Sequence, residues 1–186
     1  MSPQSKVWFK LRGLLILPLY LFAIFCDWGD VERPLVIFPL GGVLFAFGLF
    51  LRIWAQVHLH YRLRIHKVLT TTGPYVYVRN PIYIANTMIL VAITVLSGLL
   101  WFAPIMFFGC AVTYSLVVRY EEAHLTEKYG DPYVKFLSRV PRWLPRFDRT
   151  AKSPNQDFRR FIYPSVRAEM YIFLMLVPLI AKELLY

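Results

Sequence analysis

The sequence predicts an all-α membrane protein: a polytopic membrane helical bundle of about five membrane helices, including a helical hairpin. Hydrophobic residues make up 58% of the 186 residues and charged residues only 17%, whereas soluble proteins average about 45–50% and about 25%. The apolar residues form long runs, and the basic residues lie between these runs, as is typical of membrane helices and their cytoplasmic loops. The length fits a single integral membrane domain over residues 1–186.

The first two apolar segments, near residues 11–26 and 34–57, are joined by a short acidic link. A basic N-terminus precedes the first segment, which resembles a signal peptide, but no small-x-small cleavage site follows it. We therefore expect a retained membrane span. The second segment contains Gly41, Gly42 and Gly48, and small residues of this kind let membrane helices approach each other closely.

The longest apolar stretch runs from Ile82 to Val118. A single helix of this length would measure roughly 55 Å, against a hydrocarbon core of about 30 Å. We therefore expect a hairpin that turns at Ser97-Gly98, with spans near 82–97 and 99–118. A fifth apolar segment, near 168–185, is short and contains a proline. It fits either a membrane span or an interfacial helix, and we favour the span.

The segments between the spans predict the orientation. Segments 58–80 and 119–165 are basic, the link after the first span is acidic, and the tip of the hairpin is uncharged. With four spans ending at Val118, every basic segment falls on one face, which the positive-inside rule places in the cytoplasm. The net charge of +10 could also indicate nucleic-acid binding. Because the basic residues lie in loops between spans, we predict no nucleic-acid partner.

Polar and aromatic residues gather at the two cytoplasmic ends of the hairpin. A hairpin brings its ends together, so Arg79, Asn80 and Tyr83 should lie near Glu121 and Glu122. Arginine binds a carboxylate through its planar fork, and a glutamate accepts a hydrogen bond from an ammonium group. This combination predicts a cofactor pocket that faces the cytoplasm.

Aromatic residues add a second feature to the predicted pocket. Tyr75, Tyr77 and Tyr83 offer ring faces for a flat base or a cation. S-adenosylmethionine has a carboxylate, an ammonium, a positive sulfur and a flat base, and therefore suits this set of side chains. Many other ligands share some of these groups.

Each of these residues also has a plainer interpretation. The acidic pair could be a solvated helix end paired with Arg119, Arg79 could be a positive-inside anchor, and Tyr83 could be an interfacial aromatic residue. The dipeptide Asn80-Pro81 could be an ordinary helix start, with the asparagine as its cap. His58 and the histidine two residues later could form half a metal site. No carboxylate or cysteine lies near them in the sequence, so we predict no metal.

Several short motifs follow one another in a defined order. Gly-Pro-Tyr-x-Tyr-x-Arg-Asn-Pro-x-Tyr begins at Gly73 and leads into the hydrophobic hairpin. Glu-Glu-x-x-Leu begins at Glu121, Tyr-Gly-x-x-Tyr at Tyr129 and Val-Pro-Arg-x-x-Pro at Val140. This ordered set, over roughly residues 51–145, resembles the isoprenylcysteine carboxyl methyltransferase and phospholipid N-methyltransferase superfamily. The resemblance implies methyl transfer from S-adenosylmethionine to a membrane lipid or lipidated acceptor, such as an isoprenylcysteine-like molecule or a phospholipid amine.

The motifs and the resemblance together give a set of expected site residues. Cofactor contacts are expected from Gly73, Tyr75, Arg79, Asn80, Pro81, Tyr83, Glu121, Glu122 and Tyr133, and catalytic roles from Glu121, Glu122 and Arg142. Asn80 stands where many members have histidine, and an asparagine can donate a hydrogen bond but cannot titrate near neutral pH. Two other functions stay open: a nicotinamide-dependent membrane reductase of related architecture, and a non-enzymatic lipid-binding membrane protein.

Overall fold

The structure is a computed structural model, and it describes every residue except 1–2, 30, 32–33, 62–68, 148–158 and 186. The described residues form helices and connecting turns, with no strand, which confirms the predicted all-α class. The α-helices are α1 (Pro3–Phe25), α2 (Pro34–Tyr61), α3 (Pro81–Leu96), α4 (Ala103–Tyr129), α5 (Asp131–Arg139), α6 (Arg159–Glu169) and α7 (Val177–Leu185). Short 3-10 helices η2 (Gly73–Val76), η3 (Leu100–Phe102) and η4 (Met170–Leu176) lie between them.

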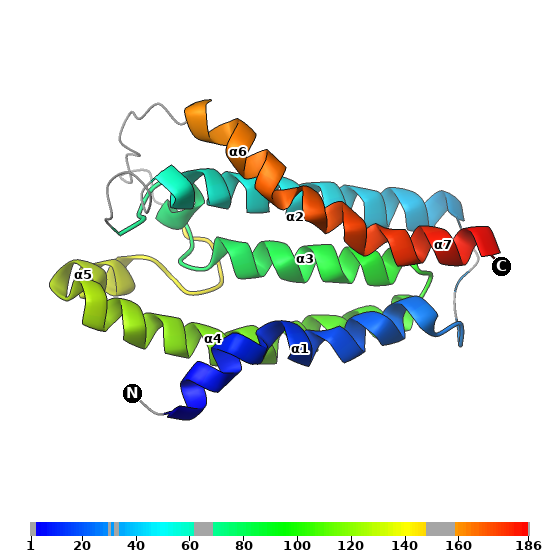
Figure 1. Cartoon of the computed structure of the whole chain (residues 1–186), viewed down its shortest axis with the longest axis horizontal. Coiled ribbons are helices and arrows are strands. Elements are labelled where there is room, and N and C mark those ends of the chain that lie inside the picture. The colour runs from blue at the N-terminus through cyan, green and yellow to red at the C-terminus, as the bar shows by residue number, and fades with distance from the viewer. Residues whose placement is uncertain (1–2, 30, 32–33, 62–68, 148–158, 186) are drawn as a thin grey trace.

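The long helices form one bundle in which successive helices run in opposite directions (Figure 1). Helix α3 lies along α2 and also contacts α4, and α1 lies along α4. The α6–η4–α7 segment begins against α2 and ends near α1. One end of the bundle therefore holds the start of α1, the junction of η2 with α3, the end of α4, and α5. The other end holds the α1–α2 link, the hairpin tip and the end of α7.

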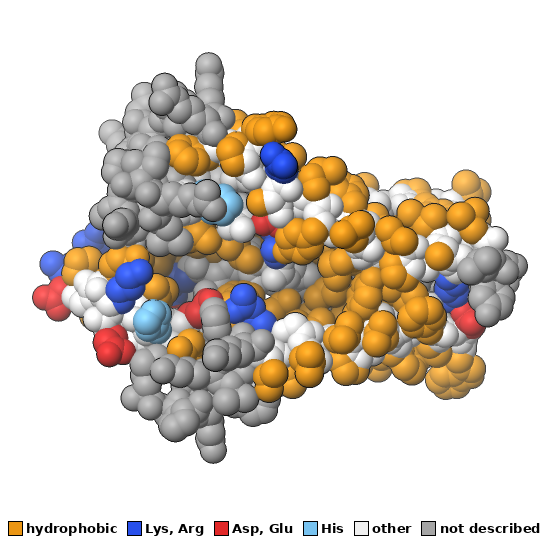
Figure 2. All heavy atoms as spheres, viewed as in Figure 1, with side chains coloured by type: hydrophobic (Ala, Val, Ile, Leu, Met, Phe, Trp, Pro, Cys, Tyr) orange, Lys and Arg blue, Asp and Glu red, His pale blue; other side chains and the backbone are white. Residues whose placement is uncertain are grey.

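Five apolar helical segments account for the membrane character. Three are long and apolar enough to cross a membrane, namely Pro34–His60, Leu100–Tyr129 and Phe161–Lys182, and two are shorter, namely Leu11–Phe25 and Pro81–Leu96. Hydrophobic side chains cover most of the visible middle of the molecule, while charged side chains gather mainly at the end that holds α5 (Figure 2). This distribution supports the predicted helical membrane bundle, including its α3–α4 hairpin.

Two segments differ in extent from their predicted spans. Helix α4 continues beyond the predicted apolar span to Tyr129, so the acidic pair lies on the same continuous helix as that span. The fifth apolar segment begins earlier, in α6, and becomes a 3-10 helix at Met170–Leu176. Pro178 follows this segment, and it has no N–H to give Leu174 an α-helical bond. The N–H of Val177 donates to the Leu174 carbonyl instead.

Glycines on one face of α2 allow its close contact with α3. A Cβ added at Gly48 would lie 3.2 Å from the Ala85 carbonyl oxygen and 3.1 Å from the Met88 Cβ, and a Cβ added at Gly41 would meet Leu96. Gly42 differs, because nothing lies within 4 Å of the position of its Cβ. Of the three glycines singled out from the sequence, two therefore lie in the helix contact.

We predict that Gly48→Leu lowers the stability of the bundle by about 1–3 kcal/mol, because the added side chain must separate α2 from α3. The matched control is Gly42→Leu, which makes the same chemical change on the same helix in open space. Thermal unfolding in detergent, followed by circular dichroism, measures the difference. Equal melting temperatures for the two variants would contradict the close α2–α3 contact.

Candidate functional site

A cavity of about 720 Å³ lies at the end of the bundle where α4 leads into α5. Its walls come from α1, α2, α3, α4, α5, η2, η4 and the segment before η2. All the predicted site residues except Gly73 and Arg142 line this cavity, namely Tyr75, Arg79, Asn80, Pro81, Tyr83, Glu121, Glu122 and Tyr133. The folding of the hairpin thus brings together residues that are about 40 positions apart in the sequence.

Glu122 lies between two arginines at the cavity wall. Arg142 Nε donates to Glu122 Oε1 at 3.0 Å, and Arg79 Nη1 lies 3.4 Å from the same oxygen. The Glu122 and Arg79 side chains are each only 13% exposed. Hydrogen bonding to Glu122 raises the pKa of Arg142, so this arginine stays cationic at any physiological pH. Two guanidinium groups around one carboxylate give this part of the wall an excess of positive charge, which suits a bound carboxylate.

Glu121 has a different environment from its neighbour. The hydroxyl of Tyr83 donates to Glu121 Oε1 at 2.7 Å, and the ring of Tyr83 packs against that of Tyr114 with 4.8 Å between centroids. A phenol is a neutral donor, so this hydrogen bond orients the carboxylate without supplying a compensating positive charge. The plainer interpretation, in which the acidic pair bonds to Arg119 at a solvated helix end, does not describe either carboxylate.

Asn80 fixes the segment that follows α5. It occupies the cap position of α3 with Pro81 in the first turn, but its side chain makes no capping hydrogen bond. Its amide nitrogen instead donates to the backbone carbonyl of Arg142 at 3.2 Å. Farther along, the N–H of Arg146 donates to the Tyr77 carbonyl at 3.0 Å. The asparagine therefore helps to hold the segment that delivers Arg142 to the acidic pair.

Three residues singled out from the sequence lie outside the cavity lining. Gly73 has a φ of 61°, and a Cβ there would lie 2.4 Å from the ring of His58. A residue with a side chain would therefore clash with His58, so the position requires glycine. The ring of Tyr77 packs against Trp54 and Phe147, with centroids at 6.4 and 5.4 Å. The third, Arg142, reaches the cavity through Glu122.

The buried tyrosines of the cavity are neutral hydrogen-bonding groups. Burial, with a smaller contribution from Glu122, raises the pKa of Tyr133 to about 12, and burial also raises the pKa of Tyr75. The relative exposures of Tyr75 and Tyr133 are only 8% and 3%. Both hydroxyls therefore keep their protons at physiological pH, and the rings offer apolar faces to a ligand.

Four buried polar atoms on the cavity wall have no hydrogen-bond partner among the described residues. They are Gln56 Oε1, Thr70 Oγ1, Arg79 Nε and Tyr129 OH. Buried polar groups in folded proteins nearly always have partners, and an unsatisfied one costs about 1–3 kcal/mol. The concentration of such atoms around a single cavity indicates a site for a polar ligand.

A second polar group at the cavity was not predicted from the sequence. Arg52 donates to Glu169 at 2.6 Å, to the Tyr171 hydroxyl at 2.6 Å and to the side-chain carbonyl of Asn86. The carboxylate of Glu169 is only 2% exposed. Arg52 and Asn86 each interrupt an apolar stretch, and a polar residue within a membrane span is a functional candidate. That signal could have identified both residues.

The two histidines of the His-x-His motif bond to hydroxyl groups. Nδ1 of His58 lies 2.9 Å from Thr72 Oγ1, and Nδ1 of His60 lies 3.3 Å from Ser165 Oγ. Across the residues that the structure describes, no group of three or more His, Cys, Asp or Glu side chains is placed to hold a metal ion.

Comparison with known proteins identifies the family. The family model "Phospholipid methyltransferase" matches residues 36–132, slightly more than half of the chain. The chain belongs to this family. The match covers α2, α3 and α4, which carry most of the cavity wall, and it confirms the resemblance seen in the ordered motifs.

Two curated relatives have names that concern metal resistance. The nickel-cobalt-cadmium resistance protein NccN of Alcaligenes xylosoxydans xylosoxydans is 28% identical over 95 residues, which are 51% of this chain and 43% of the relative. The cobalt-zinc-cadmium resistance protein CzcN of Cupriavidus metallidurans is 24% identical over 95 residues, with the same coverage. The matched segment thus spans less than half of each relative. No solved structure matches the chain.

We predict that Asn80→Ala loosens the segment after α5, because it removes the bond to the Arg142 carbonyl. One hydrogen bond contributes about 1 kcal/mol, so the state in which the segment after α5 is detached should become roughly fivefold more populated. Limited trypsin digestion measures this as faster cleavage after Arg142 and Arg146. The control is Ser138→Ala, which removes an exposed bond within α5. Equal cleavage rates in the two variants would contradict the role given to Asn80.

Proposed function

We propose that this protein transfers a methyl group from S-adenosylmethionine to a lipid or lipidated acceptor in the membrane. The observation that carries the proposal is the separation of charge in the cavity. Arg79 and Arg142 make one part of the wall positive around Glu122, while Glu121 presents a carboxylate bonded to a neutral phenol. A ligand with a carboxylate and a cationic group fits both parts at once.

The residues present fit this cofactor group by group. Arg79 lines the cavity, and its guanidinium, whose Nε has no partner among the described residues, can donate to the cofactor's carboxylate. Glu121 can accept from its ammonium. The buried rings of Tyr75 and Tyr133 provide flat faces for its adenine. Polar groups of the ligand would also be partners for Gln56, Thr70 and Tyr129, whose buried polar atoms have none within the described part of the chain.

S-adenosylmethionine supplies a methyl group on a positively charged sulfur. An acceptor lone pair attacks the methyl carbon, the carbon–sulfur bond breaks, and its electrons stay on sulfur. The protein's part in this reaction is positioning the reactants and excluding water. A carboxylate acceptor needs no base, whereas an amine acceptor must lose a proton. Glu121 suits that role, because the oxygens of Glu122 are already occupied by Arg142 and Arg79.

Membership in a methyltransferase family favours this reaction over nicotinamide-dependent reduction. The presence of Arg79, Glu121 and Glu122 in the cavity favours an enzyme over a non-enzymatic protein. A non-enzymatic lipid-binding protein would not need to bind the cofactor product. Binding of S-adenosylhomocysteine therefore separates the proposed enzyme from that alternative.

We predict that Arg79→Ala, Glu121→Gln and Glu122→Gln each weaken S-adenosylhomocysteine binding about tenfold to a hundredfold. Each change removes a charge-assisted hydrogen bond, or the group that positions one, which contributes about 1.5–3 kcal/mol. Isothermal titration calorimetry of the purified protein measures the affinity. The melting temperature of each variant distinguishes a loss of binding from a loss of folded structure.

The same helices offer matched controls for these variants. Glu127→Gln changes an exposed glutamate one and a half turns farther along α4, and Arg139→Ala changes an exposed arginine of α5. Both should bind S-adenosylhomocysteine as tightly as the parent. If the three site variants also bind as the parent does, the proposed pocket is wrong.

We further propose that the cavity end of the bundle faces the cytoplasm, because the start of α1, Arg79 and the basic helix α5 lie at that end. In a background with Cys26 and Cys110 replaced by alanine, we predict that a cysteine at Lys135 reacts with an impermeant maleimide only after the membrane is opened. A cysteine at Trp28, in the α1–α2 link, should react in intact cells. The reverse pattern would overturn the orientation.

A further inference from the structure

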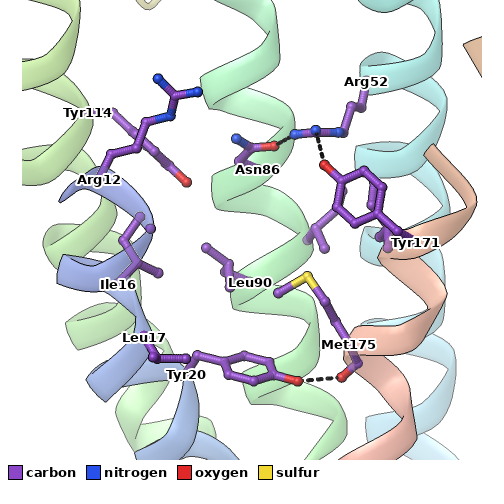
Figure 3. A pocket seen from close by; sticks show the side chains of 13 residues that line it. Arg12, Ile16, Leu17, Tyr20, Arg52, Asn86, Leu90, Tyr114, Tyr171 and Met175 are labelled. Carbon is purple, nitrogen blue, oxygen red and sulfur yellow. Dashed lines mark hydrogen bonds between the residues drawn. The ribbon is translucent and has the colours of Figure 1, made fainter. Parts of the chain in front are cut away.

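A second cavity, of about 440 Å³, lies between α1, α3 and η4 and adjoins the first. Arg12, Arg52, Asn86 and Tyr171 line both cavities, so the two meet at these residues. Figure 3 shows Arg12 and Arg52 on opposite sides of this junction, with Asn86 between them.

The second cavity is charged at one end and apolar at the other. Away from the arginines, its walls are formed by side chains such as Ile16, Leu17, Leu90 and Met175. At the end away from the arginines, the Tyr20 hydroxyl donates to the Met175 carbonyl at 2.7 Å. This arrangement matches an amphiphile whose polar group lies at the junction and whose hydrocarbon chain lies toward Tyr20.

The positive charge of Arg12 and Arg52 at the junction favours an anionic polar group on the amphiphile. Arg52 uses one donor on each of its three nitrogens for Glu169, Asn86 and Tyr171. A guanidinium has five N–H donors, so two remain for a ligand. Arg12 faces the same space from α1 and lies within electrostatic range of Glu121. Two guanidinium groups on either side of a junction form a site for a carboxylate or a phosphate.

We propose that Arg12 and Arg52 bind the anionic group of the methyl acceptor, and that the adjoining apolar cavity holds its hydrocarbon chain. The inference rests on the proposed methyl transfer. An acceptor held in this way presents the rest of its polar part to the first cavity, where Glu121 lies. Most of the second cavity's lining comes from α1 and η4, which lie outside the family match at residues 36–132. Acceptor recognition is thus built largely from parts of this chain that the family match does not include.

The test is native mass spectrometry of the purified full chain with dodecyl phosphate, dodecanoate and dodecanol, which share one chain length. The parent should bind at least one of the two anions about tenfold more tightly than the alcohol. Arg12→Gln should lower the anion affinity about tenfold and leave the alcohol unchanged. Equal binding of anions and alcohol by the parent, or unchanged anion binding by Arg12→Gln, would overturn recognition by the arginines.

A second variant tests the hydrocarbon site without touching a charge. Gly13 lines the apolar cavity, and a Cβ there meets nothing within 4 Å, so Gly13→Phe should fill the cavity. Gly42→Phe is its matched control, because Gly42 also has open space but lines neither cavity. We expect Gly13→Phe to lower dodecyl phosphate binding about tenfold and Gly42→Phe to leave it unchanged. Equal binding by the two variants would overturn the hydrocarbon site.

Two further measurements are needed. The first distinguishes a site for an amphiphile from a site for a free anion. The second distinguishes failure of the amphiphile site from failure of the proposed methyl transfer. Displacement of dodecyl phosphate by inorganic phosphate at equal concentration would show a site for a free anion, which contradicts an amphiphilic ligand. S-adenosylhomocysteine is titrated in parallel. If the parent does not bind it while the results with dodecyl phosphate hold, the proposed methyl transfer fails and the amphiphile site stands.

Discussion

The position of Glu122 between Arg79 and Arg142 is the interaction on which the rest of the site depends. Glu122 belongs to α4, Arg79 precedes α3, and Arg142 follows α5. The contacts among these three side chains therefore link three separate parts of the chain. Taking a carboxylate out of water is costly, and partners of opposite charge mainly offset that cost, so a buried ion pair adds little net stability. Its contribution here is positional. The contact with Glu122 holds the Arg79 side chain beside the cavity that it lines.

The sequence predicted the part of this arrangement that follows from membrane physics. An apolar stretch too long for one span must turn, its ends must meet, and the basic segments must lie on one face, so the proximity of Arg79 to Glu122 was predictable. The course of irregular segments was not, because it depends on single hydrogen bonds such as that from Asn80 to the Arg142 carbonyl. The contact of Arg52 with Glu169 spans 117 positions, and no periodicity or motif relates residues so far apart.

In the proposed methyl transfer, the division of the site between two cavities would separate binding of the cofactor from binding of the acceptor. The matched residues 36–132 build α2, α3 and α4 and supply Arg79 and Glu122. Helix α1 and η4 lie outside that match, and they supply most of the wall of the apolar cavity. Under the proposed function, a change in these flanking parts would alter the acceptor that is bound and leave the proposed cofactor cavity in place. The curated relatives are 24–28% identical over about half of the chain, and their names carry no information about this chain's acceptor.

The unequal lengths of the hairpin helices account for the place where the two cavities meet. Helix α3 has 16 residues, or about 24 Å, and falls short of a hydrocarbon core of about 30 Å, whereas α4 has 27 residues, or about 40 Å. The start of α3 thus lies deeper than the end of α4, and the space above it is enclosed by the longer α2 and α4. Polar groups in this recess are shielded from bulk water, where charge-assisted hydrogen bonds are stronger. An apolar cavity that opens beside Arg12 brings a membrane-soluble chain to the same depth. In the proposed methyl transfer, the cofactor and the lipid acceptor would therefore meet at the start of the short helix α3.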